Sequence, residues 1–309
     1  MQKHHLQGLF SLLLLLILVP LLGCGTTESL VEKINPKTLY AKIREPKPGL
    51  KKKVMIVPLL DYAGAGAERA EEITAGLAGR LEEVPHLLVY DAPDNLPAQL
   101  APRSPKLGIV TDPGLIHMAQ DSDMNALITG VINPIEITSK RSGIWPFRKS
   151  LKVFEVSLVM NVMDTTSGTI LLTRLESEKV SIPLDETEDR EKKEIITEVL
   201  VKSLPPILKR QAKAIAKALL ALPWTGRILA VEKDLIKINA GRELGLKAGH
   251  RFEVFARAGV ISSQSGLSYG LLGKKIGEIE TDSVMKDFSL ALPLAEGGFL
   301  AGQVIRSRP

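Results

Sequence analysis

The sequence predicts an α+β or α/β protein in which a leader and a tether precede a mixed-sheet domain and a small all-β, barrel-like domain. Three observations lead to this prediction. A strand–helix–strand pattern begins at Lys51, a long hairpin and a helix follow it up to Leu222, and short β-rich runs separated by glycines fill the remainder. A β-α-β start favours parallel strands, and short strands with glycine corners and no helix favour a small barrel or sandwich.

The first thirty residues contain the only cysteine of the chain, Cys24. A short, mildly basic head precedes an almost wholly apolar run, Leu6 to Leu22, and this order is typical of a bacterial export signal. The run is short for a transmembrane helix, and Pro20 lies near its end. We therefore expect residues 1–23 to be a signal peptide.

The residues around this cysteine, Leu21-Leu22-Gly23-Cys24, resemble the lipobox of bacterial lipoproteins. The resemblance implies cleavage before Cys24, a diacylglycerol thioether on its sulfur, and an acylated, palmitate-bearing N-terminus. Gly25 stands where a signal for inner-membrane retention would usually show aspartate, which implies the periplasmic face of the outer membrane. Two or more acyl chains anchor a protein stably, so the mature chain would need no membrane helix. An uncleaved anchor with an incidental cysteine is the alternative.

Composition narrows the function classes. The chain has 40 basic and 35 acidic residues, and only 4% of its residues are aromatic. This small surplus, without a basic stripe interleaved with aromatic residues, argues against nucleic-acid binding. A single cysteine allows no intrachain disulfide, so stability must come from packed cores. Residues 24–50 are polar and proline-containing, which is typical of a tether.

Residues 51–222 are expected to form the mixed-sheet domain. A continuous apolar run predicts a strand buried on both faces, and an apolar stripe at helical spacing predicts a helix after it. The proline-rich segment 93–113 is expected to be a functional or mobile loop. The expected elements up to this point are a strand at Val54–Leu60, a helix at Glu68–Glu83, a strand at His86–Pro93 and a short helix at Pro113–Gln120.

A third strand, with a bend or bulge at Gly130 and Pro134, is expected to lead into a long hairpin whose turn is Asp164–Gly168. One face of the first hairpin strand is uniformly apolar, which predicts a one-sided antiparallel strand. The residues of this face are Phe154, Val156, Leu158, Met160 and Val162.

A helix is expected from Asp189 to Ala221, interrupted at Pro205-Pro206. Its second half is strongly basic, which predicts a solvated face over a core-packed helix. A helix lying on anionic lipid is the alternative. The basic residues are Lys209, Arg210, Lys213 and Lys217.

No motif predicts a catalytic or metal site. Gly266–Gly270 matches the G-x-S-x-G pattern of hydrolases, but a polar loop surrounds it and a strand follows where that motif needs a helix. Asp121–Asn125 begins like a calcium loop, but Ala126 replaces the turn glycine. The histidines beyond the leader are far apart in the sequence. We expect no cofactor, no metal and no enzymatic activity.

Residues 223–309 are expected to form the barrel-like domain. Within them, IKINAGRELGLKAGHRFEVF (Ile236–Phe255) resembles the C-terminal domain of flagellar assembly protein T, whose core reads approximately V-x-I-N-x-G-x-x-x-G-(L/V)-x-x-G-D-x-F-x-V. The matching residues are Ile236, Ile238, Asn239, Gly241, Gly245, Leu246, Gly249, Phe252 and Val254.

His250 departs from this pattern, because the family usually has aspartate there. We expect Asn239 and Gly241 at a corner with positive φ, and Gly245 and Gly249 in tight turns between strands.

The preceding domain resembles an α/β domain shared by the middle domain of flagellar assembly protein T, the N-terminal domain of Tol-system translocation protein B and the curli secretion-channel lipoprotein. The resemblance rests on the strand VMIVPLLDYAG, the helix after it, the strand NALITGVI and the long hairpin. It implies assembly, docking or secretion rather than catalysis. We expect an outer-membrane-anchored periplasmic lipoprotein that serves an envelope machine, with the flagellum as the first candidate.

A secretion-channel lipoprotein of curli type is the alternative, and a ligand-binding or enzymatic lipoprotein is the third hypothesis. A channel needs lipid-facing strands of about 9–11 residues. Pro134–Val156 could form one such hairpin with an aromatic tip at Trp145 and Phe147. Its basic residues favour a solvent loop instead, and they are Lys140, Arg141, Arg148 and Lys149.

The expected partners are membrane lipid through Cys24 and envelope or flagellar basal-body proteins, with further copies of the chain as a second candidate. The loop Val260–Gly273 is rich in serine and glycine and also carries apolar residues, which is typical of a partner site. Its candidate binding residues are Leu267, Tyr269 and Leu271. The alternatives are that Leu271 and Leu272 fold back onto the barrel, or that docking uses the 93–113 loop.

Overall fold

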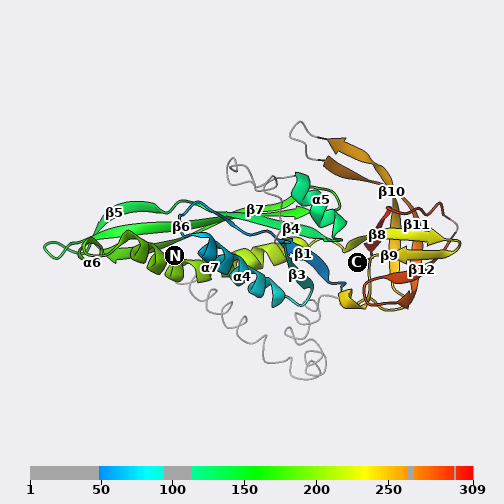
Figure 1. Ribbon diagram of the computed structural model, residues 1–309, viewed down its shortest axis with the longest axis horizontal. Coiled ribbons are helices and arrows are strands. Elements are labelled where there is room, and N and C mark those ends of the chain that lie inside the picture. The colour runs from blue at the N-terminus through cyan, green and yellow to red at the C-terminus, as the bar shows by residue number, and fades with distance from the viewer. Residues whose placement is uncertain (1–48, 94–112, 263–267, 296, 309) are drawn as a thin grey trace, which may run out of the picture. The chain divides into compact units, whose positions relative to one another are not determined.

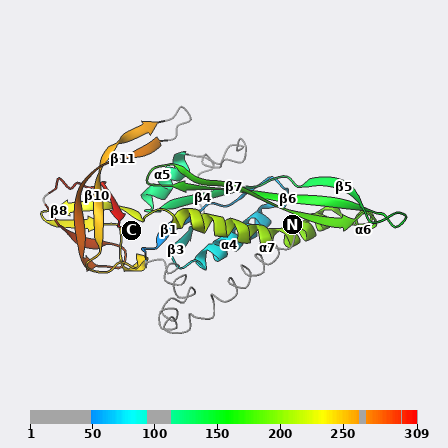
Figure 2. The ribbon, with the colours of Figure 1, turned by 180° about the vertical axis from the view of Figure 1, so that it is seen from behind.

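The computed structural model describes residues 49–93, 113–262, 268–295 and 297–308 of the 309-residue chain (Figures 1 and 2). Residues from Gly49 to Pro309 form a compact unit of their own. The expected signal peptide, Cys24 and the tether up to residue 48 lie outside the described residues, as does most of the 93–113 segment. Leu50, the last residue of the expected tether, is instead buried in the barrel core. Within the described ranges, no helix is both long and apolar enough to cross a membrane.

A seven-stranded mixed sheet forms the first part of this unit, in the order β3-β1-β4-β6-β5, with β2 paired to β4 and β7 paired to β6. β1 is parallel to β3 and β4, and β5, β6 and β7 are antiparallel to their neighbours. The predicted mixed sheet with a parallel start is confirmed. The strands are β1 (Lys52–Ile56), β2 (Leu60–Asp61), β3 (Leu87–Asp91), β4 (Ala126–Ile132), β5 (Glu136–Ser142), β6 (Lys149–Asp164) and β7 (Ile170–Pro183).

Helices cover both faces of the parallel half of the sheet. α4 (Ala67–Glu82) and α7 (Lys192–Leu220) pack on one face, and α5 (Pro113–Asp121) packs on the other (Figure 1). Successive residues of β1 point to opposite faces, so Ile56 joins the core under α4 and α7 while Met55 joins the core under α5. A strand buried on both faces therefore reads as a continuous apolar run, as predicted.

The third strand is interrupted at Pro134, one of the two predicted bends, whereas Gly130 pairs regularly with Met160, so the bend predicted there is wrong. The chain leaves β4 at Ile132 and resumes as β5 at Glu136, and both strands pair along the same long strand, β6. The apolar face predicted for β6, from Phe154 to Val162, is buried in the core under α7.

α7 runs unbroken through Pro205 and Pro206, so the predicted interruption is wrong. Each proline removes one backbone donor, whose usual acceptors would be the carbonyls of Val201 and Lys202. Both of these residues are exposed, so water can satisfy their carbonyls. Buried side chains on both sides of the prolines hold the helix on the sheet, and they are Leu200, Leu204, Ile207, Leu208 and Ile215.

The basic residues of α7 have two roles. Arg210 pairs with Glu176 and, at 3.0 Å, with Glu178 on β7, and it also donates to the Ser177 carbonyl at 2.8 Å. This residue therefore joins the helix to the sheet. Lys209, Lys213 and Lys217 are exposed, in agreement with a solvated face. The short helix α6 (Asp185–Glu188) precedes α7 at the end of β7.

A closed barrel forms the second part, and its strands follow one another in the order β10-β11-β12-β9-β8-β13. Trp224 and Phe252 pack in its core with ring centroids 5.7 Å apart. The predicted barrel-like fold is confirmed. Its strands are β8 (Thr225–Glu232), β9 (Leu235–Ile238), β10 (Arg251–Ser262), β11 (Ser268–Val284), β12 (Ser289–Pro293) and β13 (Val304–Ser307).

Positive φ angles were predicted for the corner at Asn239 and Gly241, and tight turns for Gly245 and Gly249. The prediction fails at the first two residues. Gly245 and Gly249 have φ angles of 83° and 80°, as expected for tight turns. Gly241 has a φ of −134°, so the predicted positive φ is wrong. Glycine is required there because a Cβ atom would lie 2.2 Å from the Lys286 carbonyl oxygen. Asn239 is not in the left-handed region either.

His250 stacks on Phe252 with ring centroids 5.7 Å apart, and burial lowers the pKa of its imidazole. Its carbonyl accepts hydrogen bonds from the backbone N–H and the hydroxyl of Thr281, both at 2.9 Å. His250 thus packs as part of the barrel.

Gly241→Ala should destabilise the protein by about 1–3 kcal/mol, because the added methyl group overlaps backbone atoms that cannot move independently. Gly298→Ala is the matched control, because nothing lies within 4 Å of the added Cβ and the residue is exposed. Equilibrium unfolding in urea measures both variants. Equal free energies of unfolding for the two variants would contradict the steric role of Gly241.

Candidate functional site

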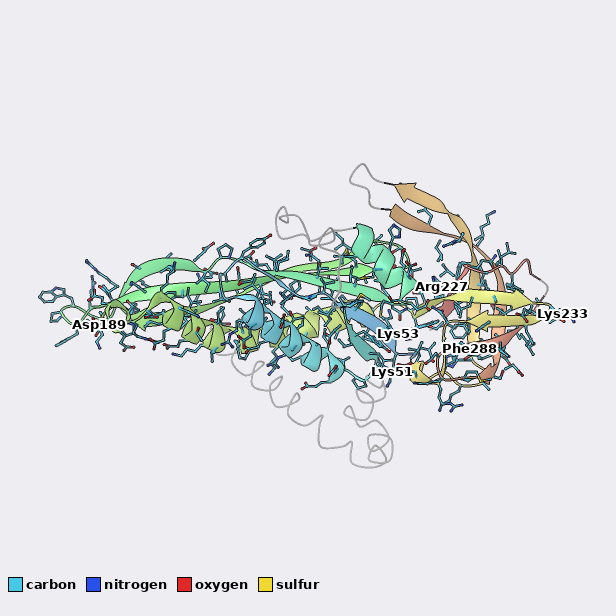
Figure 3. All side chains as sticks on the ribbon, in the orientation of Figure 1. Lys51, Lys53, Asp189, Arg227, Lys233 and Phe288 are labelled. Carbon is cyan, nitrogen blue, oxygen red and sulfur yellow. The ribbon has the colours of Figure 1, made fainter. Side chains whose placement is uncertain are left out.

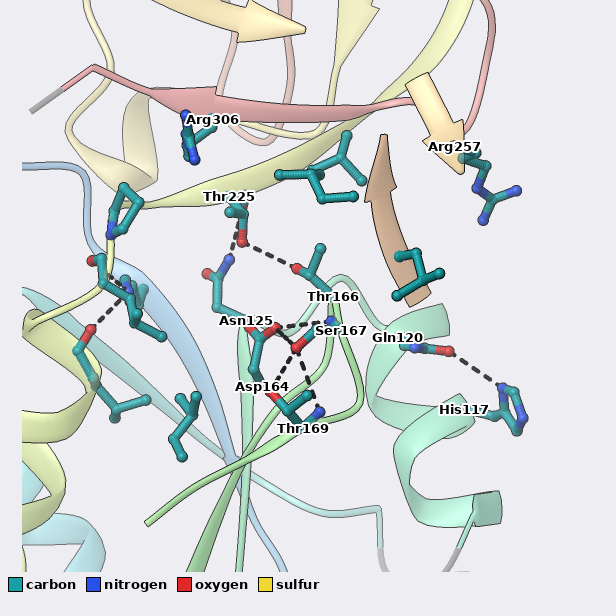
Figure 4. Close-up of a pocket in the computed structure, with 18 of the residues that line it drawn as sticks. His117, Gln120, Asn125, Asp164, Thr166, Ser167, Thr169, Thr225, Arg257 and Arg306 are labelled. Atoms are coloured by element: carbon teal, nitrogen blue, oxygen red, sulfur yellow. Dashed lines mark hydrogen bonds between the residues drawn. The ribbon is translucent and has the colours of Figure 1, made fainter. Parts of the chain in front are cut away.

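A cavity of about 740 Å³ lies where one end of the sheet meets the barrel (Figure 4). The turn between β6 and β7, the start of β1, α5 and the end of α7 line it on the sheet side. Strands β8, β10, β11 and β13 contribute from the barrel side. Its apolar lining residues are Leu171, Leu219, Leu222, Leu271, Leu272 and Val304.

The turn between β6 and β7 supplies a preorganised polar wall. The Asp164 carboxylate accepts hydrogen bonds from the Ser167 backbone N–H, at 2.8 Å, and from the Ser167 hydroxyl (Figure 4). The Ser167 hydroxyl also lies 2.7 Å from that of Thr169. Gly168 has a φ of 72°, which closes the turn. Turn chemistry was predicted for Asp164–Gly168 and is confirmed.

Asn125 joins the sheet to the barrel beside this turn. Its side-chain oxygen accepts from the Lys53 backbone N–H at 2.9 Å, and its side-chain amide donates to the Thr225 carbonyl at 2.6 Å. The hydroxyls of Thr166 and Thr225 lie 3.0 Å apart, which makes a second link across the same boundary (Figure 4). The Asn125 side chain therefore bonds both β1 and the start of the barrel.

Charged and amide groups at Asp123 strengthen the same junction. The Arg227 Nε atom lies 2.8 Å from the Asp123 Oδ1 atom, and the Asn239 amide donates to that oxygen at 2.9 Å. Figure 3 shows Arg227 at this boundary, on the same side of the barrel as Lys51 and Lys53. At another point of the boundary, the Tyr90 hydroxyl donates to Glu243 at 2.7 Å.

Lys52 lies in the cavity wall as a buried cation. Its ammonium group donates to the carbonyls of Leu219 and Leu222, at 2.7 and 2.8 Å, and so caps the end of α7. Burial lowers the pKa of Lys52 to about 8, and the nearby Asp164 charge opposes that shift. The lysine is therefore a structural group whose charge depends on pH in the mildly alkaline range.

Two arginines stand on the barrel side of the cavity (Figure 4). Arg306 already has interaction partners. It pairs with Glu253 at 2.9 Å and lies 4.5 Å from the centre of the Phe255 ring. Arg257 is exposed and makes no ion pair with any other residue described in the structure. Of these two cations, Arg257 is the one free to meet a bound group.

The arrangement of serine, histidine and aspartate in the cavity does not match a catalytic triad. In a triad, the histidine bridges the serine and the carboxylate. Here Ser167 bonds Asp164 directly, and the His117 Nδ1 atom lies 3.2 Å from the Gln120 side-chain oxygen (Figure 4). Among the described residues, no group of histidine, cysteine and carboxylate side chains is placed to hold a metal ion.

The predicted partner loop, Val260–Gly273, is largely a hairpin. β10 extends to Ser262 and β11 begins at Ser268, with Ile261 paired to Tyr269 and Gly259 paired to Leu271. The expectation of a loop is therefore wrong for residues 260–262 and 268–273, which belong to strands. Backbone hydrogen bonds of an antiparallel ladder order the described residues on both sides of 263–267.

Two of the three predicted binding residues, Tyr269 and Leu271, lie on β11. Leu271 and Leu272 are each 45% exposed and line the cavity, so they are neither core residues nor fully free. Tyr269 belongs to β11, and Leu267 lies outside the described residues, as does Cys24.

Sequence reasoning missed Lys52 and Asn125. Lys52 stands in the run Lys51-Lys52-Lys53 at the start of a buried strand, and Asn125 directly precedes the buried strand β4. A polar residue beside a fully apolar strand was the available signal, because such a residue needs a hydrogen-bonding partner at the sheet edge.

No protein-family model matches the sequence, and no curated protein matches it significantly. Among solved structures, the hypothetical protein CT253 from Chlamydia trachomatis is 14% identical, with a TM-score of 0.33 over 55% of this chain and 96% of that chain. A PelC dodecamer from Paraburkholderia phytofirmans is 15% identical, with a TM-score of 0.28 over 54% and 94%. Lipoprotein GNA1162 from Neisseria meningitidis is 15% identical, with a TM-score of 0.28 over 54% and 99%.

The free energy of unfolding of the unmutated protein should rise by on the order of 1 kcal/mol between pH 8 and pH 9. The Lys52→Met variant should lack this rise. The pKa of Lys52 falls from 10.5 to about 8 on folding, so in this range the unfolded chain binds more protons than the native protein. Raising the pH therefore favours the native state. Urea unfolding of both proteins at each pH measures the difference, and parallel pH profiles would contradict it.

Proposed function

We propose that this chain is a lipoprotein on the periplasmic face of the outer membrane that acts as an assembly or docking factor of an envelope machine. The flagellum is the machine to which the resemblance of Ile236–Phe255 points. Lipid on Cys24 would anchor the chain, and the described unit would present the docking surface. The Leu21–Cys24 lipobox supports the anchoring part of this proposal.

The observation that carries the docking part is a two-stranded arm, residues 257–262 and 268–272, on the barrel. β10 pairs with β13 only from Phe252 to Phe255, and β11 pairs with β12 only from Ile279 to Val284. In the described part of the chain, the arm residues thus pair only with each other, and Figure 1 shows them projecting from the barrel. The outer edges of such an arm can accept a strand from a partner.

Apolar exposure on the arm supports the same role. Ile261 is 55% exposed, and Leu271 and Leu272 are 45% exposed. Leu271 and Leu272 also line the cavity. The cavity wall includes Arg257, which makes no ion pair with the described residues. A partner strand along the arm could therefore place a side chain or a terminal carboxylate in the cavity.

Site-specific photo-crosslinking in cells should capture an envelope-machine component from position 261 on the arm. Position 300 is the matched control, because Leu300 is 66% exposed on the barrel but lies outside the arm. Deletion of the chain should also impair motility or another surface appendage. Crosslinks of equal yield from both positions, together with intact motility and appendages, would contradict the proposal.

Metabolic labelling with an alkyne analogue of palmitate should label the wild-type chain and not the Cys24→Ser variant, because this residue is the only cysteine. Gel fluorescence after click chemistry measures the label. Label retained on the serine variant would show that Cys24 is not the attachment point.

The alternative is an oligomeric secretion channel of curli type. The exposed apolar tip between β5 and β6 is the observation that favours it, because a lipid-facing hairpin would begin in this way. Heat-stable rings in detergent and ion conductance would support the channel. A monomeric chain in detergent that conducts no ions would exclude it.

A further inference from the structure

The turn between β5 and β6 carries the three most exposed large apolar side chains among the described residues. Ile144 is 84% exposed, Trp145 is 78% exposed and Phe147 is 83% exposed. They follow one another in a single tip, closed by the Ser142–Lys149 strand pair and by a backbone hydrogen bond from Phe147 to Ile144 at 2.7 Å. Isolated exposed apolar residues are ordinary, but three together with two aromatic rings indicate a binding surface.

The residues next to this tip are basic. Lys140 and Arg141 precede it on β5, Arg148 follows it, and Lys149 is the first residue of β6; all four are exposed. The strand segments nearest the tip carry no carboxylate, since the first acidic residues along β5 and β6 are Glu136 and Glu155. The tip therefore combines apolar and aromatic side chains with four flanking positive charges.

Acidic residues lie on α6, the short helix that follows β7. α6 contributes Asp185, Glu186 and Glu188, and it follows the end of β7. The last β7 residue, Pro183, pairs with Leu151, whereas β5 and β6 continue to the Ser142–Lys149 pair. The Leu184 backbone N–H, directly before α6, still donates to the Ser150 carbonyl at 3.0 Å, so Arg148 lies two residues, roughly 7 Å of strand, beyond the last of these bonds. The loop between β5 and β6 reaches past α6 in Figure 1.

We propose that residues 140–149 form a membrane-contact site that inserts Ile144, Trp145 and Phe147 into the interface of a bilayer containing anionic phospholipid. Tryptophan is favoured at the headgroup level of a bilayer, and lysine and arginine beside it pair with lipid phosphates. An apolar face that enters the headgroup boundary by about 5–10 Å is enough for interfacial binding.

Charge and length favour this occupant over two others. An exposed aromatic cluster could contact a protein, but four basic residues with no nearby acid on their strands complement an anionic surface. A spanning hairpin needs about 9–11 lipid-facing residues per strand, and β5 is exposed, short and polar up to Ser142. The tip therefore fits a surface contact rather than a channel wall.

The test uses the full chain reconstituted in vesicles of phosphatidylglycerol and phosphatidylethanolamine whose acyl chains carry bromine. The chain has two tryptophans, and Trp224 is only 4% exposed in the barrel core. Bromine should quench the fluorescence of Trp145 and leave that of Trp224 unchanged. The Trp145→Phe variant gives the Trp224 background, so the difference between the two proteins reports the tip alone.

Two variants separate the contributions. Arg141→Gln with Arg148→Gln should lower the ratio of docked to free tip by roughly tenfold or more, because each cation near an anionic surface contributes to binding. Ile144→Ser with Phe147→Ser should also lower quenching while keeping Trp145 as the probe. The matched controls are Lys213→Gln with Lys217→Gln on the exposed face of α7, and Leu300→Ser on the barrel.

Vesicles of phosphatidylcholine should quench Trp145 much less than the anionic vesicles. Three results would overturn the proposal: no quenching of Trp145 in anionic vesicles, equal quenching in both vesicle types, or tip variants that behave like their controls. A tip that stays unquenched in lipid but forms crosslinks to a protein in cells would also overturn it and assign the tip to a protein partner. Since no partner protein is present, this result is independent of docking by the arm.

Discussion

The pairing of β6 along its whole length is the constraint on which the rest of the described structure depends. β4 and β5 share one edge of this strand and β7 takes the other, so three strands receive their register from it. Its 16 residues span roughly 50 Å at about 3.3 Å per residue. The turn that lines the cavity begins at Asp164, at one end of β6. The apolar tip and Arg148 lie next to the opposite end of β6. Two surfaces of different chemistry are thus held apart by one rigid strand.

Several hydrogen bonds join the sheet to the barrel at their junction. Leu50 packs in the barrel core just before β1, and the Lys51 backbone N–H donates to the Leu244 carbonyl at 2.9 Å. Asn125 and Lys52 bind backbone carbonyls at the same boundary. Hydrogen bonds of this kind lose more when one partner is removed than they add when formed, because the remaining group stays buried and unpaired. The cavity wall is therefore expected to be rigid, and adaptation to a partner would fall to the arm.

The sequence predicted the elements whose apolar pattern is strong, and it failed where a contact distant in sequence decides. The two-sided run of β1 and the alternating face of β6 were recognised because burial imposes their periods. The continuity of α7 through Pro205 was not predicted. Packing of the helix on the sheet outweighs the loss of two backbone donors, and such packing leaves no signal in the local sequence pattern. Gly241 was assigned the wrong role, since its close neighbour, the Lys286 carbonyl, lies far along the chain. Lys52 and Asn125 were missed for the same reason, as both bond carbonyls remote in sequence.

The long antiparallel ladder between β6 and β7 also determines how the molecule would respond to force. A pull between the tip and the barrel would act along β6, parallel to the strand and perpendicular to its ladder hydrogen bonds. Bonds loaded in shear share the force and must break together, whereas a hairpin peeled from its open end loses them one by one. A chain tethered at both ends in this way would transmit tension without lengthening.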